Sequence, residues 1–214
     1  MAPEAENRAQ LGEAGAAAPV APFDDSPRGR TLKAMVEVIA HGGYHDATVD
    51  RVLERARVGW EEFMRLFGDL DGCFIATLEG GFELAAAQAT EAIADLPRDA
   101  AIEAVFEPAL RAVLECAAAN PGLTNLCLVE APALGLRALD ARETGLQRFV
   151  DLLVERSGAA NRTDGGAPPS LAAEMVVGGI HEVMQRKARA GELSELPGIA
   201  AELRQLWLPA LRET

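Results

Sequence analysis

Apolar residues recur at intervals of three and four positions along most of the chain, and this spacing predicts helices. The pattern is clearest over residues 99–119, where one face carries Ile102, Val105, Phe106, Ala109, Leu110, Val113, Leu114 and Ala117. Alanine is abundant and aromatic residues are few, which favours closely packed helices over sheets. The expected fold class is therefore all-α. The predicted helices span about 30–41, 48–55, 60–67, 71–96, 99–119, 123–130, 136–157, 170–190 and 197–211.

Composition and helix length divide the chain into three parts. Residues 1–26 are rich in alanine, proline, glycine and acidic residues, so we expect a disordered tail. Residues 27–70 hold three short helices. Residues 71–214 hold longer helices that should form a bundle, interrupted over 157–169 by a segment with the composition of a flexible loop.

The three short helices have the layout of a helix-turn-helix unit. Thr48 is suited to cap the second helix, and a tight turn over 57–59 leads into the third helix, 60–67. Short helices are not stable alone in water, so both must pack on the helix that precedes them. Three short helices with a tight turn between the last two are typical of DNA-binding domains.

Glycine, aromatic, capping and turn positions in this unit follow a family pattern. The matching residues are Gly43, Tyr44, Ala47, Thr48, Val49, Ala56, Val58, Phe63, Phe67 and Phe74. Over about residues 28–75 the chain thus resembles the N-terminal domain of the TetR-type (TetR/AcrR) transcriptional regulators. The match is specific because turn, core and cap positions agree in register.

The resemblance implies a cytoplasmic, ligand-responsive transcriptional regulator without a cofactor. Such a protein, expected to be a repressor, binds a palindromic operator in double-stranded DNA as a homodimer, and a small apolar effector releases it. Arginine near position 30 often reaches DNA in the family, although Arg28 and Arg30 could equally be a solvated charge pair. The expected DNA contacts are Arg30, Thr48, Trp60, Glu62 and Arg65.

For residues 71–214 the resemblance implies an effector-binding and dimerisation domain. The expected pocket residues are Phe82, Phe106, Leu110, Phe149 and Met175. The family pairs its last two long helices with those of a partner, which implicates Ile180, Val183, Met184, Leu203 and Trp207. These apolar faces would equally suit the core of a monomer.

Two features inside the predicted helices have alternative interpretations. Pro108 removes the backbone donor to Ala104, so the helix there is kinked, either beside a cavity or without one. Gly80-Gly81 lowers helix propensity, so either a neighbour packs closely there or the helix bends.

Several positions depart from the family pattern. Arg57 stands where the turn usually has glycine, Met64 replaces a tyrosine, and Leu70 replaces a lysine that usually contacts phosphate. Glu61 and Glu62 either stabilise the start of the third helix or, for a base contact, accept a hydrogen bond from cytosine. The alternative function is a TetR-like ligand- or partner-binding protein with weakened or lost specific DNA binding.

The charge distribution bears on that alternative. The net charge is −13, which argues against indiscriminate binding to nucleic acid. Residues 28–70 carry seven basic and seven acidic side chains, so the DNA-binding part is neutral while the rest is acidic. Such a domain should bind DNA with a modest affinity that depends steeply on salt.

Other chemistries find little support. We see no phosphate-binding glycine loop, no Ser-His-Asp arrangement and no cluster of metal ligands, so we expect neither an enzyme nor a metal site. The three cysteines fit small core positions in a reducing cytosol. His181 lies on an apolar helix face, either as a satisfied core or interface residue or as a pocket ligand. No stretch approaches the length of about 20 apolar residues that a membrane span requires.

Overall fold

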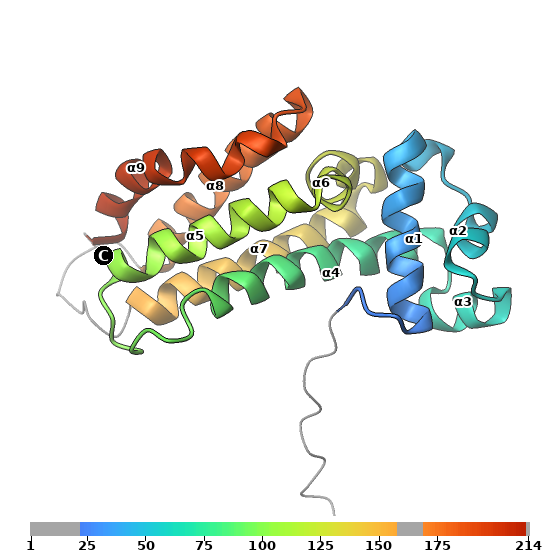
Figure 1. The fold of residues 1–214 in the computed structure, drawn as a ribbon, viewed down its shortest axis with the longest axis horizontal. Coiled ribbons are helices and arrows are strands. Elements are labelled where there is room, and N and C mark those ends of the chain that lie inside the picture. The colour runs from blue at the N-terminus through green and yellow to red at the C-terminus, as the bar shows by residue number, and fades with distance from the viewer. Residues whose placement is uncertain (1–21, 158–168, 213–214) are drawn as a thin grey trace, which may run out of the picture.

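The computed structural model describes residues 22–157 and 169–212, and all regular structure within these ranges is helical (Figure 1). The predicted all-α fold class is confirmed. Most of the predicted disordered tail and of the predicted loop lies outside the described residues. The α-helices are α1 (Pro27–Gly42), α2 (Val49–Ala56), α3 (Trp60–Phe67), α4 (Leu70–Glu91), α5 (Ile102–Ala119), α6 (Pro121–Asn125), α7 (Leu136–Ser157), α8 (Pro169–Ala190) and α9 (Ala200–Arg212).

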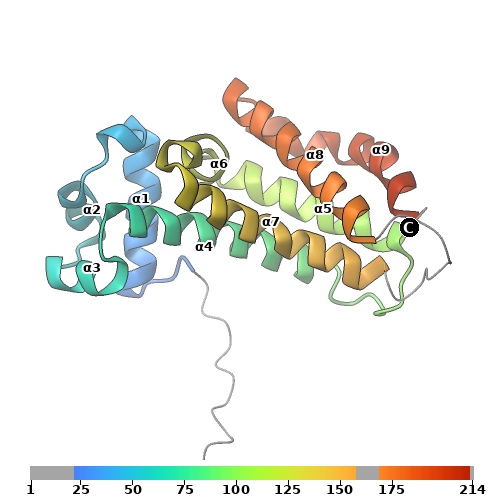
Figure 2. The same ribbon diagram turned by 180° about the vertical axis from the view of Figure 1, so that it is seen from behind.

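The molecule is elongated, and the three short helices form one end of it. In both views α4, α5 and α7 run along the long axis, while α1 crosses the end of α4 (Figures 1 and 2). Helix α4 packs against α5 and α7, α7 packs against α8, and α5 packs against α9. Helix α6 lies between α1 and the start of α7, so it connects the short-helix unit to the bundle (Figure 1).

Side-chain caps explain where α1 and α2 begin, whereas α3 follows Gly59 without a side-chain cap. The Ser26 hydroxyl accepts a hydrogen bond from the Gly29 N–H at 3.1 Å, directly before a proline at the first position of α1. The Thr48 hydroxyl accepts from the Arg51 N–H at 3.4 Å, as predicted for a cap of α2. Met35, Val52 and Phe63 are fully buried between the three helices, which holds α3 against α1 and α2.

Residues 22–26 depart from the predicted disorder. The Phe23 ring is partly buried against the apolar cluster of the short-helix unit, and it lies over the flat surface that Gly80 leaves on α4. Ser26 also donates its backbone N–H to the Asp24 carboxylate at 3.0 Å. The composition of residues 1–26 predicted disorder because it averages over the whole segment. The order of residues 22–26 comes from two specific side chains, the Phe23 ring and the Ser26 cap.

The segment after α5 is less regular than predicted. In place of one helix over 123–130, α6 is followed by the π-helix Leu126–Glu130 and a 3-10 helix, Ala131–Leu134. Pro132 has no backbone N–H, so it cannot continue an α-helical ladder. Among the described residues no single helix is long and apolar enough to cross a membrane. One pair, Ile102–Ala119 and Pro121–Leu134, passes that test together but is bent by 101° at the break.

Close packing accounts for the glycine pair in α4. A methyl group added at Gly81 would lie 2.6 Å from Sγ of Cys127 in the π-helix, so the close-packing alternative is the one observed. Gly179 in α8 is covered in the same way by the Trp207 ring, 2.5 Å from such a methyl group. Gly178 beside it has no heavy atom of the described chain within 4 Å of an added methyl group, so only one glycine of that pair allows close approach.

Candidate functional site

Helix α3 presents a mixed apolar and charged face to solvent. Phe63 is its one fully buried side chain, while Trp60 is 54% exposed and Met64 and Arg65 are also exposed. Glu62 is half-buried and lies 3.4 Å from the Arg65 guanidinium, one helical turn away. Three of the predicted DNA contacts therefore lie on α3, and its outer face is available to a partner.

The other two predicted contacts lie on neighbouring elements. Thr48 is exposed at the start of α2, where its hydroxyl is engaged as the cap. Arg30 is half-buried on α1. Its Nε donates to the Ala56 carbonyl at 3.2 Å, and its Nη1 donates to the Asp25 carbonyl at 2.8 Å. Arg30 therefore binds the last turn of α2, a role that neither sequence interpretation included.

Two basic side chains of the short-helix unit, one on α1 and one on α2, form ion pairs with acidic side chains. Lys33 pairs with Asp25 at 3.0 Å, and Arg55 pairs with Glu37 at 2.9 Å. Arg57 is exposed in the turn and makes no ion pair within the described part of the chain. Its φ of 53° and ψ of 49° place it in the left-handed region, where the family's glycine would be unstrained.

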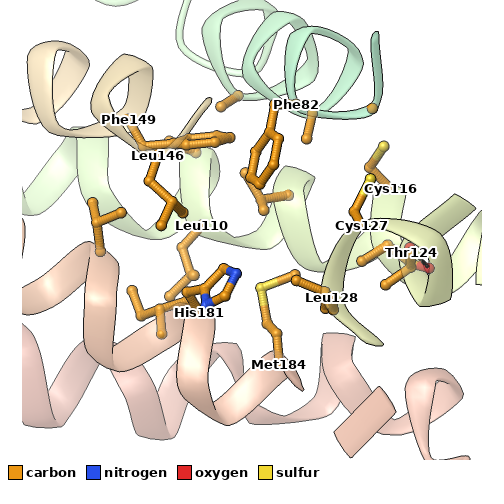
Figure 3. Close-up of a pocket in the computed structure, with 18 of the residues that line it drawn as sticks. Phe82, Leu110, Cys116, Thr124, Cys127, Leu128, Leu146, Phe149, His181 and Met184 are labelled. Carbon is orange, nitrogen blue, oxygen red and sulfur yellow. Dashed lines mark hydrogen bonds between the residues drawn. The ribbon is translucent and has the colours of Figure 1, made fainter. Parts of the chain in front are cut away.

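A cavity of about 130 Å³ lies in the middle of the bundle, lined by residues of α4, α5, α7, α8 and the segment 120–128 (Figure 3). Phe82, Phe106, Leu110 and Phe149 line it, as the resemblance implies. Met175 does not. It lies on the outer face of α8 and is 60% exposed, so its assignment to the pocket is wrong. The remaining wall is almost entirely aliphatic or aromatic.

The predicted dimer residues also need correction. Ile180 and Met184 line the cavity, and Leu203 is buried in the same apolar cluster. Val183 and Trp207 are half-buried against that cluster. The helical period correctly grouped residues on faces, but it could not say which face of α8 meets the bundle. Among the described side chains of α8 and α9, the large apolar ones that are exposed are Leu171, Met175 and Leu206.

His181 is the exceptional side chain in the cavity wall. Figure 3 shows its ring reaching from α8 toward Met184 and the space below Phe82. Its Nε2 is buried and has no hydrogen-bond partner within the described part of the chain. The pKa of His181 is lowered from 6.5 to about 4, chiefly by burial and then by the Arg142 charge, while the Glu182 charge opposes the shift, so the ring is neutral at pH 7.

The other polar side chains of the wall have partners. The Thr124 hydroxyl donates to the Ala117 carbonyl at 2.9 Å, and the Asn120 amide donates to the Cys116 carbonyl at 2.9 Å. Burial raises the pKa of Cys127 to about 12, so this thiol stays protonated and unreactive. Sequence reasoning could place Cys127 in a core but gave no sign that it faces a cavity.

One wall of the cavity also contacts the short-helix unit. Cys127 and Leu128 of the π-helix line the cavity, and the carboxylate of Glu130, the last residue of that helix, accepts a hydrogen bond from the Tyr44 N–H at 3.0 Å. The Tyr44 hydroxyl donates to the Asp71 carboxylate at the start of α4. Burial, followed by this hydrogen bond, raises the pKa of Tyr44, so it remains a donor. The π-helix Leu126–Glu130 therefore contacts both the cavity and the short-helix unit.

No protein-family model matches the chain, and no curated protein sequence matches it. Solved structures do match. FadR from Bacillus halodurans, a fatty acid degradation regulator, has a TM-score of 0.70 at 20% identity, covering 86% of this chain and 96% of that one. FadR from Bacillus subtilis, solved in complex with stearoyl-CoA, has a TM-score of 0.70 at 18% identity, covering 85% and 97%. A TetR-family transcriptional regulator from Streptomyces coelicolor has a TM-score of 0.58 at 20% identity, covering 90% and 98%.

These identities are low, so the comparisons bear on architecture. Each match extends over the short-helix unit and the bundle together, because it covers at least 85% of this chain. The sequence resemblance covered about residues 28–75 alone, and the structural match therefore adds the remaining helices. The chain has the fold of the TetR-type transcriptional regulators.

Proposed function

We propose that the chain is a ligand-responsive transcriptional regulator of the TetR type, a repressor that binds a palindromic operator as a homodimer. Residues 27–70 form the DNA-binding part, and residues 71–214 form the effector-binding and dimerisation part. A small apolar effector enters the bundle cavity and releases the DNA. The observation that carries this proposal is the π-helix Leu126–Glu130, which lines the cavity with Cys127 and Leu128 and binds the Tyr44 N–H of the short-helix unit with its last residue, Glu130.

The exposed face of α3 supports the DNA-binding role. In a helix-turn-helix the second helix enters the major groove with its first residues at the base edges. Trp60 and Arg65 are exposed there, and Glu62 and Thr48 flank them as further contacts. Arg30 acts in this proposal as a positioning residue, since it holds the end of α2 through the Ala56 carbonyl.

The exposed apolar residues of α8 and α9 support a homodimer. These helices leave Leu171, Met175 and Leu206 exposed among their described side chains, and Gly178, on the same face of α8 as Leu171 and Met175, allows close approach. Apolar side chains of this size are enriched at the core of obligate interfaces. Helix-turn-helix dimers bind half-sites about one helical turn apart, so the proposed function requires the two copies of α3 to reach successive major grooves.

The cavity supports an apolar effector. Ligand sites between the helices of bundles are typically apolar with few polar groups, and this wall has that character. One structural neighbour, FadR from Bacillus subtilis, was solved with stearoyl-CoA, a molecule with a long apolar chain. An effector that binds one conformation better than another shifts the population away from the form that binds DNA.

The contact between Glu130 and Tyr44 is the proposed link between the two parts. Replacing Glu130 with alanine removes the acceptor of the Tyr44 N–H, so the effect of a ligand on DNA affinity should shrink several-fold. Ligand affinity itself should change less, because Glu130 does not line the cavity. Glu143→Ala, on the exposed face of α7, is the matched control. An unchanged ligand response in Glu130→Ala would reject this link.

Selection from a pool of random DNA duplexes tests the proposal as a whole. The full chain should enrich a palindromic sequence whose half-sites are about one helical turn apart. The enriched duplex should bind more weakly as salt rises, since phosphate contacts release counterions. Failure to enrich any sequence at low salt would reject the DNA-binding function.

A second candidate function is a TetR-like ligand- or partner-binding protein with weakened or lost specific DNA binding. The pairing of Arg65 with Glu62 favours it, because the pair neutralises the one basic side chain of α3. Failure of the DNA selection combined with ligand binding in the cavity would support this alternative.

A further inference from the structure

One polar atom stands apart in the apolar cavity. The His181 side chain is 8% exposed, and its Nε2 lies among carbon atoms without a hydrogen-bond partner in the described part of the chain. A buried polar group left without a partner costs about 1–3 kcal/mol, so such atoms usually mark a functional position. The ring reaches into the cavity from α8, where an enclosed ligand would meet it (Figure 3).

We propose that the effector is an uncharged molecule about the size of one substituted benzene ring, carrying a single hydroxyl or carbonyl oxygen that hydrogen-bonds to Nε2 of His181. This inference rests on the proposed function, in which the cavity binds the effector. It adds the size, the charge and the one polar contact of that ligand.

The volume of the cavity sets the size. An engineered apolar cavity of about 150 Å³ stays dry and binds benzene. The cavity here, at about 130 Å³, is comparable. A substituted ring therefore fills a volume of this size in the arrangement observed.

The absence of charge in the described wall sets the charge of the ligand. No lysine, arginine, aspartate or glutamate lines the cavity. His181 is neutral at pH 7, so it cannot balance a carboxylate. Arg142 and Glu182 are the charged groups whose fields reach the imidazole, and neither contributes to the wall. An ionised ligand buried there would lose its hydration without a counter-charge.

The number of free polar partners sets the number of polar atoms on the ligand. Thr124 and Asn120 already bond backbone carbonyls, and the Gln185 amide bonds the Leu128 carbonyl at 2.7 Å. A water molecule needs two to four polar partners, and His181 offers one. A hydroxyl suits either tautomer of the ring because it both donates and accepts, and a carbonyl suits the tautomer with hydrogen on Nε2.

Calorimetric titration of the full chain at pH 7.5, without DNA, tests the inference with three matched probes. These are 4-ethylphenol, ethylbenzene and 4-ethylbenzoate, which share a ring and an ethyl group and differ in the polar group. We expect 4-ethylphenol to bind about tenfold more tightly than ethylbenzene, as one net hydrogen bond allows. 4-Ethylbenzoate should bind at least tenfold more weakly than 4-ethylphenol.

Variants assign the effect to His181. His181→Leu should lose the preference and bind 4-ethylphenol no more tightly than ethylbenzene, because the buried hydroxyl then has no partner. Ethylbenzene binding in this variant reports an intact cavity. His181→Gln keeps a polar group and should keep part of the preference. Met184→Leu, a neighbouring apolar change in the wall, should alter both neutral affinities together.

Three results would overturn the inference: equal affinity for 4-ethylphenol and ethylbenzene in the unaltered chain, a preference that survives His181→Leu, or 4-ethylbenzoate as the tightest ligand. Binding of none of the probes would overturn the size and charge assignment as well. The proposed function would survive each of these results if a larger or charged molecule released DNA from the protein.

Discussion

At the scale of single residues, two positions carry a local energetic cost, one in the backbone and one in a side chain. Arg57 has a left-handed backbone in the turn between α2 and α3, and His181 has a buried ring nitrogen without a partner in the described part of the chain. Such local costs persist where the surrounding structure fixes the residue, and they often accompany function. Each cost can be measured as a change in the free energy of unfolding.

Replacing Arg57 with glycine should stabilise the protein. The left-handed conformation costs an L-residue about 1–2 kcal/mol, and part of that gain is offset by the greater freedom of glycine in the unfolded chain. We expect the free energy of unfolding in urea to rise by about 0.5–1 kcal/mol. Arg57→Ala keeps the backbone strain and removes the same guanidinium, so it should show no such gain. A gain of equal size in both variants would trace the effect to charge instead.

The pH dependence of stability should carry the signature of His181. Its pKa in the folded protein is about 4, below the unfolded value of 6.5, so the unfolded chain takes up the proton first as the pH falls. The stability contribution is therefore complete above pH 6.5 and is lost as the pH falls toward 4. The difference in unfolding free energy between the unaltered chain and His181→Leu should shift by about 3 kcal/mol against the unaltered chain. Parallel curves for the two proteins from pH 7 to pH 4 would contradict the burial of a neutral ring.

At the scale of elements, the caps and the short helices could be predicted, and the segment after α5 could not. Thr48 and the stripe that includes Phe63 lie within a single local pattern, and the structure has α3 at the predicted bounds, Trp60–Phe67. The π-helix packs through Cys127 against Gly81 in α4, a contact between residues far apart in the chain. No local period encodes such a contact, so the sequence suggested one ordinary helix there.

A double-mutant cycle measures that contact. Gly81→Ala places a methyl group 2.6 Å from Sγ of Cys127 and should destabilise the protein by about 1–3 kcal/mol. Cys127→Ala removes the sulfur, so the double variant should be more stable than the sum of the two single effects, by about 1 kcal/mol. Simple additivity in urea unfolding would mean that α4 and the π-helix do not touch at these residues.

At the scale of the whole molecule, the composition, the helix count and the helix-turn-helix resemblance predicted the architecture, but the assignment of helix faces was only partly correct. Phe82, Phe106, Leu110 and Phe149 line the cavity, because any inward face of these long helices borders it. Met184, expected at a dimer interface, lines the cavity, and Met175, expected in the pocket, is exposed, since α8 has two apolar faces and its period does not say which one is covered. Only the packing of α9 and α7 against α8 decides that question.

The revised dimer face can be tested directly. Met175 and Leu206 are 60% and 70% exposed, so a glutamate at either position should leave the fold intact. In a dimer through this face, the buried charge should shift sedimentation equilibrium to the monomer. Leu136→Glu is the matched control, because Leu136 is 78% exposed at the start of α7 and away from this face. Dissociation by Leu136→Glu alone would place the interface elsewhere.

The most direct test of the account is the affinity of the full chain for its selected DNA duplex, measured by fluorescence anisotropy at two salt concentrations. Arg65→Ala removes the basic side chain of α3, and it should weaken binding about tenfold at low salt, with a smaller salt dependence. Arg98→Ala removes an equal charge from the loop between α4 and α5, at the far end of the molecule, and should leave the affinity unchanged (Figure 1). If the two variants bind as tightly as the unaltered chain at both salt concentrations, α3 does not read DNA and the regulator account is wrong.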